Sequence, residues 1–317
     1  MVNTTKSQDE LSQDLKNKAI AEGFELVGIA RIPGSKQIKL RTRALENWLS
    51  AGNQADMNWM EAPRRQNIQT LLKGVKSTLA VGLNYYVKAN KVPGTLSLAR
   101  YGWGRDYHKI INQRLKRVGR WLEKERPNCE WKVCVDSAPL LDKAWAEEAG
   151  IGWIAKNSNL INTKTGSWIL LGHLLCTEPL TPDKPAKPKC GKCTICIKRC
   201  PTQAITQPFI IDSRKCLAYH TIENRNTNLE EEIKIAMGSW VAGCDICQDV
   251  CPWNNNEIKS SKDPEIMPKK WMLELTEDEA LSWTDDEWKE KLKGSAFKRI
   301  KPWMWRRNIK AVQEISK

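Results

Sequence analysis

The alternation of apolar and polar residues divides the first 178 residues into helices and strands. The pattern is clearest at 107–125, where apolar residues recur at helical spacing and lysine and arginine occupy the opposite face. Because helices and strands alternate, this region predicts a layered α/β or α+β domain. The predicted helices are 8–23, 41–52, 107–125 and 137–150, and the predicted strands are 25–32, 77–86, 130–136 and 167–177.

A proline- and lysine-rich stretch, EPLTPDKPAKPKC at 178–190, predicts a domain boundary. A cysteine-rich region follows it, and from residue 256 the chain is polar, contains several tryptophans and becomes increasingly basic. We therefore predict three parts, which are residues 1–178, 179–255 and 256–317.

The first cysteine run, CGKCTICIKRCP, has the spacing C-x2-C-x2-C-x3-C-P of bacterial ferredoxins that hold [4Fe–4S] clusters. In this run the fourth cysteine ligates a second cluster, so a second set of ligands is expected. The second run has the spacing C-x2-C-x3-C-P and is one cysteine short, and Cys216 between the runs supplies the missing ligand. The predicted ligands of cluster 1 are Cys190, Cys193, Cys196 and Cys251, and those of cluster 2 are Cys200, Cys216, Cys244 and Cys247.

The alternative for these cysteines is a pair of zinc sites. Zinc sites normally pair two C-x2-C knuckles, and a run of three cysteines followed by C-P does not fit that pattern. The spacing therefore favours iron–sulfur clusters. Cys134 and Cys176 lie in predicted strands, where we expect small buried side chains.

The chain has 51 lysine and arginine residues against 37 acidic residues, for a net charge of +14. Such a charge attracts polyanions, so nucleic acid is the first partner to consider, and a merely soluble basic surface is the alternative. Between Lys289 and Lys310 there are nine basic residues and one acid, with Trp303 and Trp305 among them. Basic groups beside aromatic platforms suit single-stranded or loop RNA, and a solvated basic helix is the alternative.

No apolar run reaches the roughly 18 residues that span a bilayer. The first residues also lack the apolar segment of a signal peptide, so we expect a cytoplasmic protein without a membrane partner. Thiols stay reduced in that compartment, which again favours metal binding over disulfides.

Asp136 is the main catalytic candidate, because it follows a predicted strand and precedes a predicted helix. It has two interpretations: a helix N-cap, which the local sequence favours, or a general acid whose pKa is raised by apolar surroundings. His173 lies within an apolar strand and is expected to be a core residue. The residues at 106–108 begin like the D-x-H-x-x-G motif of His-ligated cobalamin proteins, but Ile111 occupies the glycine position.

Several segments resemble the epoxyqueuosine reductases, the enzymes that complete queuosine in tRNA. These segments are RYGWGRDYHK (100–109), 135–161, both cysteine runs, TIE (221–223) and GSAFKR (294–299). The resemblance implies an α+β fold (α/β layered) with a nitroreductase-like corrinoid-binding domain at 1–178. A bacterial ferredoxin-like domain with two [4Fe–4S] clusters at 179–255 and a basic tRNA-contacting segment at 256–317 would follow it.

The resemblance also implies cofactors and roles. Cobalamin would be bound base-off without a histidine ligand, and the substrate would be the epoxide of the wobble base of tRNA. Asp136 would be the proton donor, beside a polar group of Asp106, Tyr107 and His108. The expected corrin contacts are Trp59, Arg100, Asp136, Asn157 and Ser158, and the expected tRNA contacts are Lys298, Arg299, Arg306 and Arg307.

In the mechanism that follows, an external donor of the flavodoxin or ferredoxin type, or a chemical reductant, loads the clusters, and these reduce cobalt in a monomeric enzyme. Two rivals remain open at this point. One is a corrinoid reductive dehalogenase-like enzyme that acts on a small molecule. The other is a plain two-cluster electron carrier.

Overall fold

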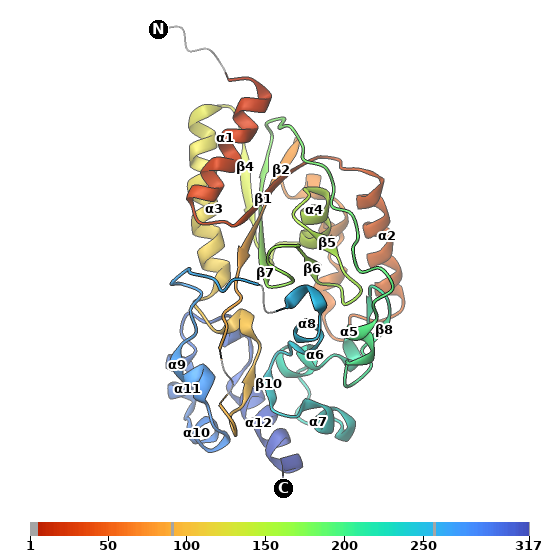
Figure 1. Cartoon of the computed structure of the whole chain (residues 1–317), viewed down its shortest axis with the longest axis vertical. Helices are drawn as coiled ribbons and strands as arrows, with labels where there is room; N and C mark the ends of the chain where they lie inside the picture. Colours follow the sequence, from red (N-terminus) through yellow and green to blue (C-terminus); the bar gives the residue numbers. More distant parts are fainter. Residues whose placement is uncertain (1–5, 90–91, 256–257, 317) are drawn as a thin grey trace.

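The structure is a computed structural model that describes residues 6–89, 92–255 and 258–316 (Figure 1). Its strands are β1 (Leu26–Arg31), β2 (Ser77–Asn84), β3 (Ser97–Leu98), β4 (Trp131–Cys134), β5 (Trp153–Ile154), β6 (Leu160–Ile161), β7 (Ile169–Cys176), β8 (Ile205–Gln207), β9 (Ile210–Ile211) and β10 (Trp240–Ala242). Its α-helices are α1 (Gln8–Ala21), α2 (Lys36–Ser50), α3 (Tyr107–Glu125), α4 (Asp142–Glu148), α5 (Ile195–Lys198), α6 (Leu217–Ile222), α7 (Glu231–Met237), α8 (Ile246–Asp249), α9 (Lys270–Glu274), α10 (Glu277–Ser282), α11 (Asp285–Lys291) and α12 (Pro302–Ser316).

A four-stranded antiparallel sheet in the order β1-β2-β7-β4 forms the centre of the upper part of the molecule (Figure 1). Helices α1 and α3 pack on one face of this sheet, and α2 and α4 pack on the other. Every residue of β2 is buried, because both faces of the sheet are covered. The close approach of α4 to β1 requires Gly28, since a Cβ atom there would lie 2.0 Å from the carbonyl oxygen of Ala149.

The predicted helices and strands of this region are mostly confirmed, and α3 has the predicted bounds. Helix α2 begins at Lys36, five residues before the predicted start, because Ser35 caps it by accepting a hydrogen bond from the N–H of Gln37 at 3.1 Å. Helix α4 begins at Asp142 and not at residue 137, because residues 137–141 form a turn and bends after β4 and do not continue the helix.

The lower part of the molecule has its own core around α12, with Phe297, Met304 and Trp305 fully buried. This core includes β3, which pairs in parallel with β10 and so joins residues 97–98 to residues 240–242. This core therefore combines residues from all three of the predicted parts of the chain. None of the described helices combines the length and hydropathy needed to cross a bilayer.

Candidate active site and cluster-binding cysteines

The loop after β4 positions Asp136 at the N-terminal end of α3. Asp136 has a φ of 44°, in the left-handed region that aspartate tolerates better than most residues. Helix α4 has Leu141 at its N-cap position and no side-chain cap. The interpretation of Asp136 as a helix cap is therefore wrong, and its carboxylate is free to make other contacts.

The structure brings together the four polar residues that were predicted to act with the substrate. Tyr107 donates a hydrogen bond from its hydroxyl to the Asp136 carboxylate. His108 contacts Asp136 through Nε2 at 3.1 Å and Asp106 through Nδ1 at 2.8 Å. Asp106 also caps α3 by accepting the N–H of His108 at 3.1 Å. The side chain of Asp136 is 55% exposed, so a ligand can reach its carboxylate.

Asp136 and His108, which contact each other, differ in their affinity for protons. Burial raises the pKa of Asp136, but the hydrogen bonds from His108 and Tyr107 outweigh it and lower the pKa overall. Burial lowers the pKa of His108, but Asp106 and then Asp136 raise it to about 9. Near neutral pH the proton therefore lies on His108. The expectation that its surroundings raise the pKa of Asp136 is wrong for this arrangement.

An exposed indole flanked by two guanidinium groups lies near this carboxylate. Trp59 is 44% exposed, with Arg65 at 4.9 Å and Arg299 at 5.9 Å from its ring centroid. Arg299 is held by Glu223, whose Oε2 accepts from Nη2 at 2.6 Å. The charge of Asp136 acts on the pKa of both arginines. Arg65 was missed in the sequence, because nothing in its local pattern separates it from a surface arginine.

Lys143 and Asp142, also missed, lie on the other side of Asp136. Lys143 donates from Nζ to the carbonyl of Ser158 at 2.8 Å, and its pKa is lowered by burial despite the opposing charges of Asp136 and Cys247. Its ammonium group is therefore influenced by the charges of both the catalytic candidate and a predicted ligand of cluster 2. Burial, and then the charge of Asp136, raise the pKa of Asp142 to about 8.

The eight predicted cluster ligands form two groups of neighbours. Burial and then the charges of Cys196, Cys190 and Cys193 raise the pKa of the Cys251 thiol. Burial and the charges of Cys216 and Cys200 likewise raise the pKa of Cys244, to about 12, and of Cys247. The assignment of these cysteines to two clusters stays a prediction. Within the described residues, no three His, Cys, Asp or Glu side chains are arranged to hold a single metal ion.

Residues predicted to contact a corrin also hold the cluster loops in place. The side-chain amide of Asn157 donates to the carbonyl of Cys247 at 3.1 Å. Arg100 donates from its backbone N–H to Asp245 at 2.8 Å and from Nη1 to Asp249 at 2.8 Å. These contacts connect the first half of the chain to the loop that carries three of the cysteines. A role in corrin binding stays a prediction for both residues, and also for Ser158, whose φ is 60°.

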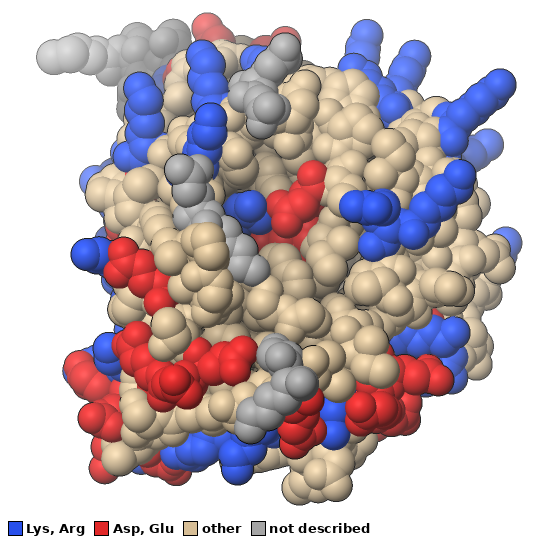
Figure 2. All heavy atoms as spheres, turned by 60° about the horizontal axis from the view of Figure 1, so that its bottom comes forward, with Lys and Arg blue, Asp and Glu red and all other residues tan. Residues whose placement is uncertain are grey.

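The basic residues near the C-terminal helix differ in how free they are. Lys298 is exposed, whereas Arg307 donates from Nη2 to the carbonyl of His220 at 2.7 Å. Arg306 is paired with Asp285. The charge is also uneven on the surface: acidic side chains gather at the lower left of Figure 2, where α10 and α11 carry acids in their first turns. The same view shows a central hollow with acidic side chains on its floor and basic ones beside them.

The two tryptophans of the basic segment have different environments. Trp303 is 40% exposed and lies under the guanidinium of Arg307 at 5.5 Å. Trp305 is fully buried and stacks on Trp283 with 5.8 Å between the ring centroids. The expectation that Trp305 offers a platform for RNA bases is therefore wrong. Trp305 lies on the face of α12 that packs against the core, so it contributes to that core and not to the surface.

Two segments of the chain match known protein families. Residues 65–137 match the family described as “Epoxyqueuosine reductase QueG, DUF1730”, and residues 189–254 match “4Fe-4S double cluster binding domain”. An epoxyqueuosine reductase of Synechococcus sp. (strain CC9605) is 60% identical over 309 residues, which are 98% of this chain and 96% of that protein.

Solved structures are similar over nearly the whole chain. The crystal structure of an epoxyqueuosine reductase with an epoxyqueuosine-modified tRNA-Tyr stem loop has a TM-score of 0.86, with 27% identity over 96% of this chain and 81% of that one. A Bacillus subtilis epoxyqueuosine reductase, with its catalytic aspartate loop swung out of the active site, has a TM-score of 0.86 and 26% identity over 96% of this chain and 82% of that one.

Proposed function

The chain belongs to the epoxyqueuosine reductase family and is an oxidoreductase, and from this premise we propose that it reduces epoxyqueuosine to queuosine at the wobble position of tRNA. The observation that carries the proposal is the contact of Asp136 with His108 and Tyr107, next to a lysine that also lies near cluster 2. A relative of known structure binds a tRNA stem loop that contains this substrate.

The proposed cofactors are two [4Fe–4S] clusters and one cobalamin. The clusters would be held by the two groups of four cysteines described above. When bound, the clusters supply single electrons and the cobalt centre supplies the reduction of carbon. The carboxyl oxygen Oδ1 of Asp142, buried without a hydrogen-bond partner among the described residues, fits a ligand with polar amide arms at this place.

The histidines support the proposal that cobalamin is bound base-off without a histidine ligand. The chain has three histidines, and each has both ring nitrogens within hydrogen-bonding distance of a protein group. His173 is fully buried, and burial lowers its pKa to about 4. His220 lies between the carbonyl of Arg214 at 2.7 Å and the side-chain amide of Asn224 at 3.0 Å. Neither is available to ligate a metal, and His108 is held between two carboxylates.

We assign the proton transfer to Asp136 and His108. An epoxide opens poorly without an acid, because an alkoxide is a poor leaving group. The imidazolium of His108 would supply the proton, and Asp136, which contacts it at 3.1 Å, would relay that proton to the epoxide oxygen. Asp106 holds that imidazolium, and Tyr107 orients the Asp136 carboxylate. The net reaction consumes two electrons and two protons and releases water.

Trp59 with its two arginines fits the nucleic-acid part of the substrate. An exposed indole suits stacking on an unpaired base, and guanidinium groups suit phosphate. Arg299 belongs both to this group and to the predicted tRNA-contacting residues. Lys298, the residue before it, is also exposed. Arg307 is less suited, because its donors are already used within the protein.

The test is the variant Asp136→Asn, reconstituted without oxygen with iron, sulfide and cobalamin and assayed on a stem loop that contains epoxyqueuosine. We expect unchanged cluster and corrin absorption and a loss of turnover of about 10²- to 10⁴-fold, the usual contribution of a general acid. The matched control is Asp278→Asn, in the first turn of α10. Turnover of Asp136→Asn at the rate of this control would disprove the role of Asp136.

A further inference from the structure

We infer that a hollow beside the ligands of cluster 1 is the docking site of an acidic one-electron carrier protein. The inference rests on the proposed function, which needs an external source of electrons. It names the surface through which the electrons arrive and the charge of the partner that brings them.

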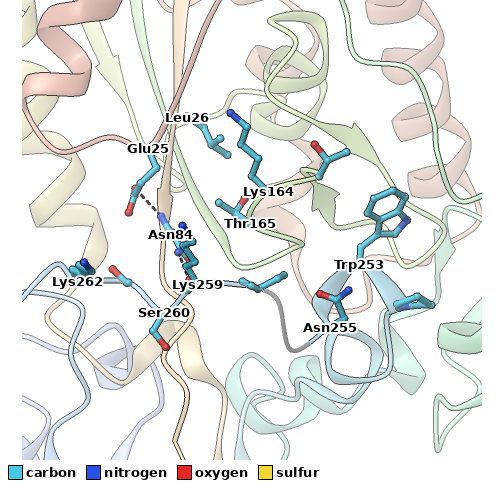
Figure 3. Close-up of a pocket in the computed structure, with 14 residues that line it drawn as sticks. Glu25, Leu26, Asn84, Lys164, Thr165, Trp253, Asn255, Lys259, Ser260 and Lys262 are labelled. Carbon is cyan, nitrogen blue, oxygen red and sulfur yellow. Dashed lines mark hydrogen bonds between the residues drawn. The ribbon is translucent and has the colours of Figure 1, made fainter.

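The hollow lies where β1 and β2 meet the segment that follows Cys251, and its volume is about 740 Å³ (Figure 3). Its wall is held by Asn84, whose backbone N–H donates to the carboxylate of Glu25 at 3.0 Å. The side-chain amide of Asn84 donates to the carbonyl of Lys259 at 3.0 Å. The hollow is thus fixed by hydrogen bonds between distant parts of the chain.

A short path leads from this hollow to the thiols of cluster 1. Trp253 lines the hollow and comes two residues after Cys251. Its ring contacts Trp153 edge to face, with 5.0 Å between centroids. Trp153 is buried in a small apolar group against which Cys190 and Cys251 pack. Two indole rings therefore lie between the hollow and two predicted ligands of cluster 1.

The predicted ligands of cluster 2 include Cys247, which is linked by hydrogen bonds to the loop at 157–158 and so toward the candidate active site. Lys143, which follows Asp136 by seven positions, donates from Nζ to the carbonyl of Ser158 at 2.8 Å, next to Asn157. The side-chain amide of Asn157 contacts the carbonyl of Cys247, a predicted ligand of cluster 2, at 3.1 Å. Electrons that leave for the substrate would therefore depart from cluster 2, so cluster 1 is the one placed to receive them from outside.

The charge of the hollow indicates the kind of carrier. Lys164, Lys259 and Lys262 line it, are exposed, and take part in no ion pair among the described residues. Burial raises the pKa of Glu25, the one acid among the described lining residues. A site for a small anion normally surrounds the anion with partly buried donors, whereas these three ammonium groups are exposed. They therefore suit the acidic surface of a protein better than a small anion. Unpaired charges of one sign steer an oppositely charged partner.

The test compares two variants with the same change in charge. The first is Lys164→Glu with Lys259→Glu and Lys262→Glu. The control reverses three exposed lysines on and near α2, which packs on the other side of the central sheet, and its changes are Lys36→Glu, Lys39→Glu and Lys73→Glu. The probe is an acidic [2Fe–2S] ferredoxin, used oxidised in binding titrations and reduced in stopped-flow measurements of cluster bleaching.

At low ionic strength we expect the first variant to bind the ferredoxin at least about tenfold more weakly and to be reduced by it at least about tenfold more slowly. The rate should also lose its dependence on salt. The control variant should behave as wild type. Equal ferredoxin affinities for the two variants, or an unchanged reduction rate in the first, would overturn the inference.

A zwitterionic viologen as reductant separates this inference from the proposed function. With viologen, the first variant should turn over epoxyqueuosine stem loop at the wild-type rate. A loss of turnover would show that the lysines act in the reaction itself and would overturn the docking inference. If the wild-type protein fails to reduce the stem loop, the proposed function fails, while ferredoxin binding still decides the docking question. Trp253→Leu should slow cluster reduction at saturating ferredoxin without weakening binding, and weakened binding alone would contradict the path.

Discussion

Replacing His108 with asparagine tests whether the imidazolium supplies the proton. In the structure His108 contacts Asp136 at 3.1 Å and Asp106 at 2.8 Å, and these two carboxylates raise its pKa to about 9. Asparagine retains a hydrogen-bond donor but holds no proton that it can release. We therefore expect turnover to fall by about 10²- to 10⁴-fold at neutral pH.

The pH profile of the wild-type enzyme gives a second measure of the same group. A group with a pKa of about 9 is about 97% protonated at pH 7.5 and about 9% protonated at pH 10, so single-turnover rates should fall about tenfold per unit above pH 9. His108→Asn should lack this decline. Asp106→Asn should move it to lower pH, because it removes the group that raises the pKa of His108 most.

The stability of the protein should follow the same titration. The folded state binds the His108 proton more tightly than the unfolded state, whose histidine has the ordinary pKa of 6.5. The stabilisation is complete below pH 6.5 and is lost as pH rises through about 9. Wild-type stability should therefore fall in this window relative to that of His108→Asn. For the reaction rate, the refuting result is also clear. If the rate of His108→Asn declines at the same alkaline pH as that of wild type, His108 is not the source of the proton.

Three further predictions concern other parts of the molecule. Cys251→Ser and Cys216→Ser should each lower the iron content from about eight to about four per chain by removing one cluster, and loss of all iron from both would contradict two separate sites. Lys298→Glu with Arg299→Glu should weaken stem-loop binding and reduce the slope of log affinity against log salt by about two, and an unchanged slope would place the contact elsewhere. Phe297→Ala should lower the free energy of unfolding by about 3–5 kcal/mol in a denaturant titration, because Phe297 is fully buried; a change below about 1 kcal/mol would show that the core closes around the gap.

The sequence predicts best where local pattern decides structure. Helix α3 has its predicted bounds, because both signals that define it are local in the sequence. Its apolar residues recur at helical spacing, and Asp106 directly before it caps its first turn. The cysteine spacing predicts iron–sulfur clusters, and the match of residues 189–254 to a 4Fe-4S double cluster binding domain agrees with it. His173 proved to be a buried core residue, as its apolar surroundings predict.

Features that depend on packing between distant segments were not predictable in this way. Asp136 and His108 are 28 positions apart, and their contact exists because β4 and α3 pack against each other. The direction of the Asp136 pKa shift depends on that contact, so local sequence gave the wrong sign. Trp305 is buried and Trp303 is exposed, although both stand in the same basic segment, because only one of them faces the core beneath α12.

The pairing of β3 with β10 has a consequence for how the protein can be divided. Residues 96–103 supply part of a core whose other buried members lie at 217 and beyond, so a fragment that stops at 178 leaves Leu96 and Leu98 without their packing partners. The two halves should consequently unfold together in a single transition and resist separate expression. Because the two parts share this core, the distances between the cysteine loops and the candidate active site should stay constant when a partner binds or leaves.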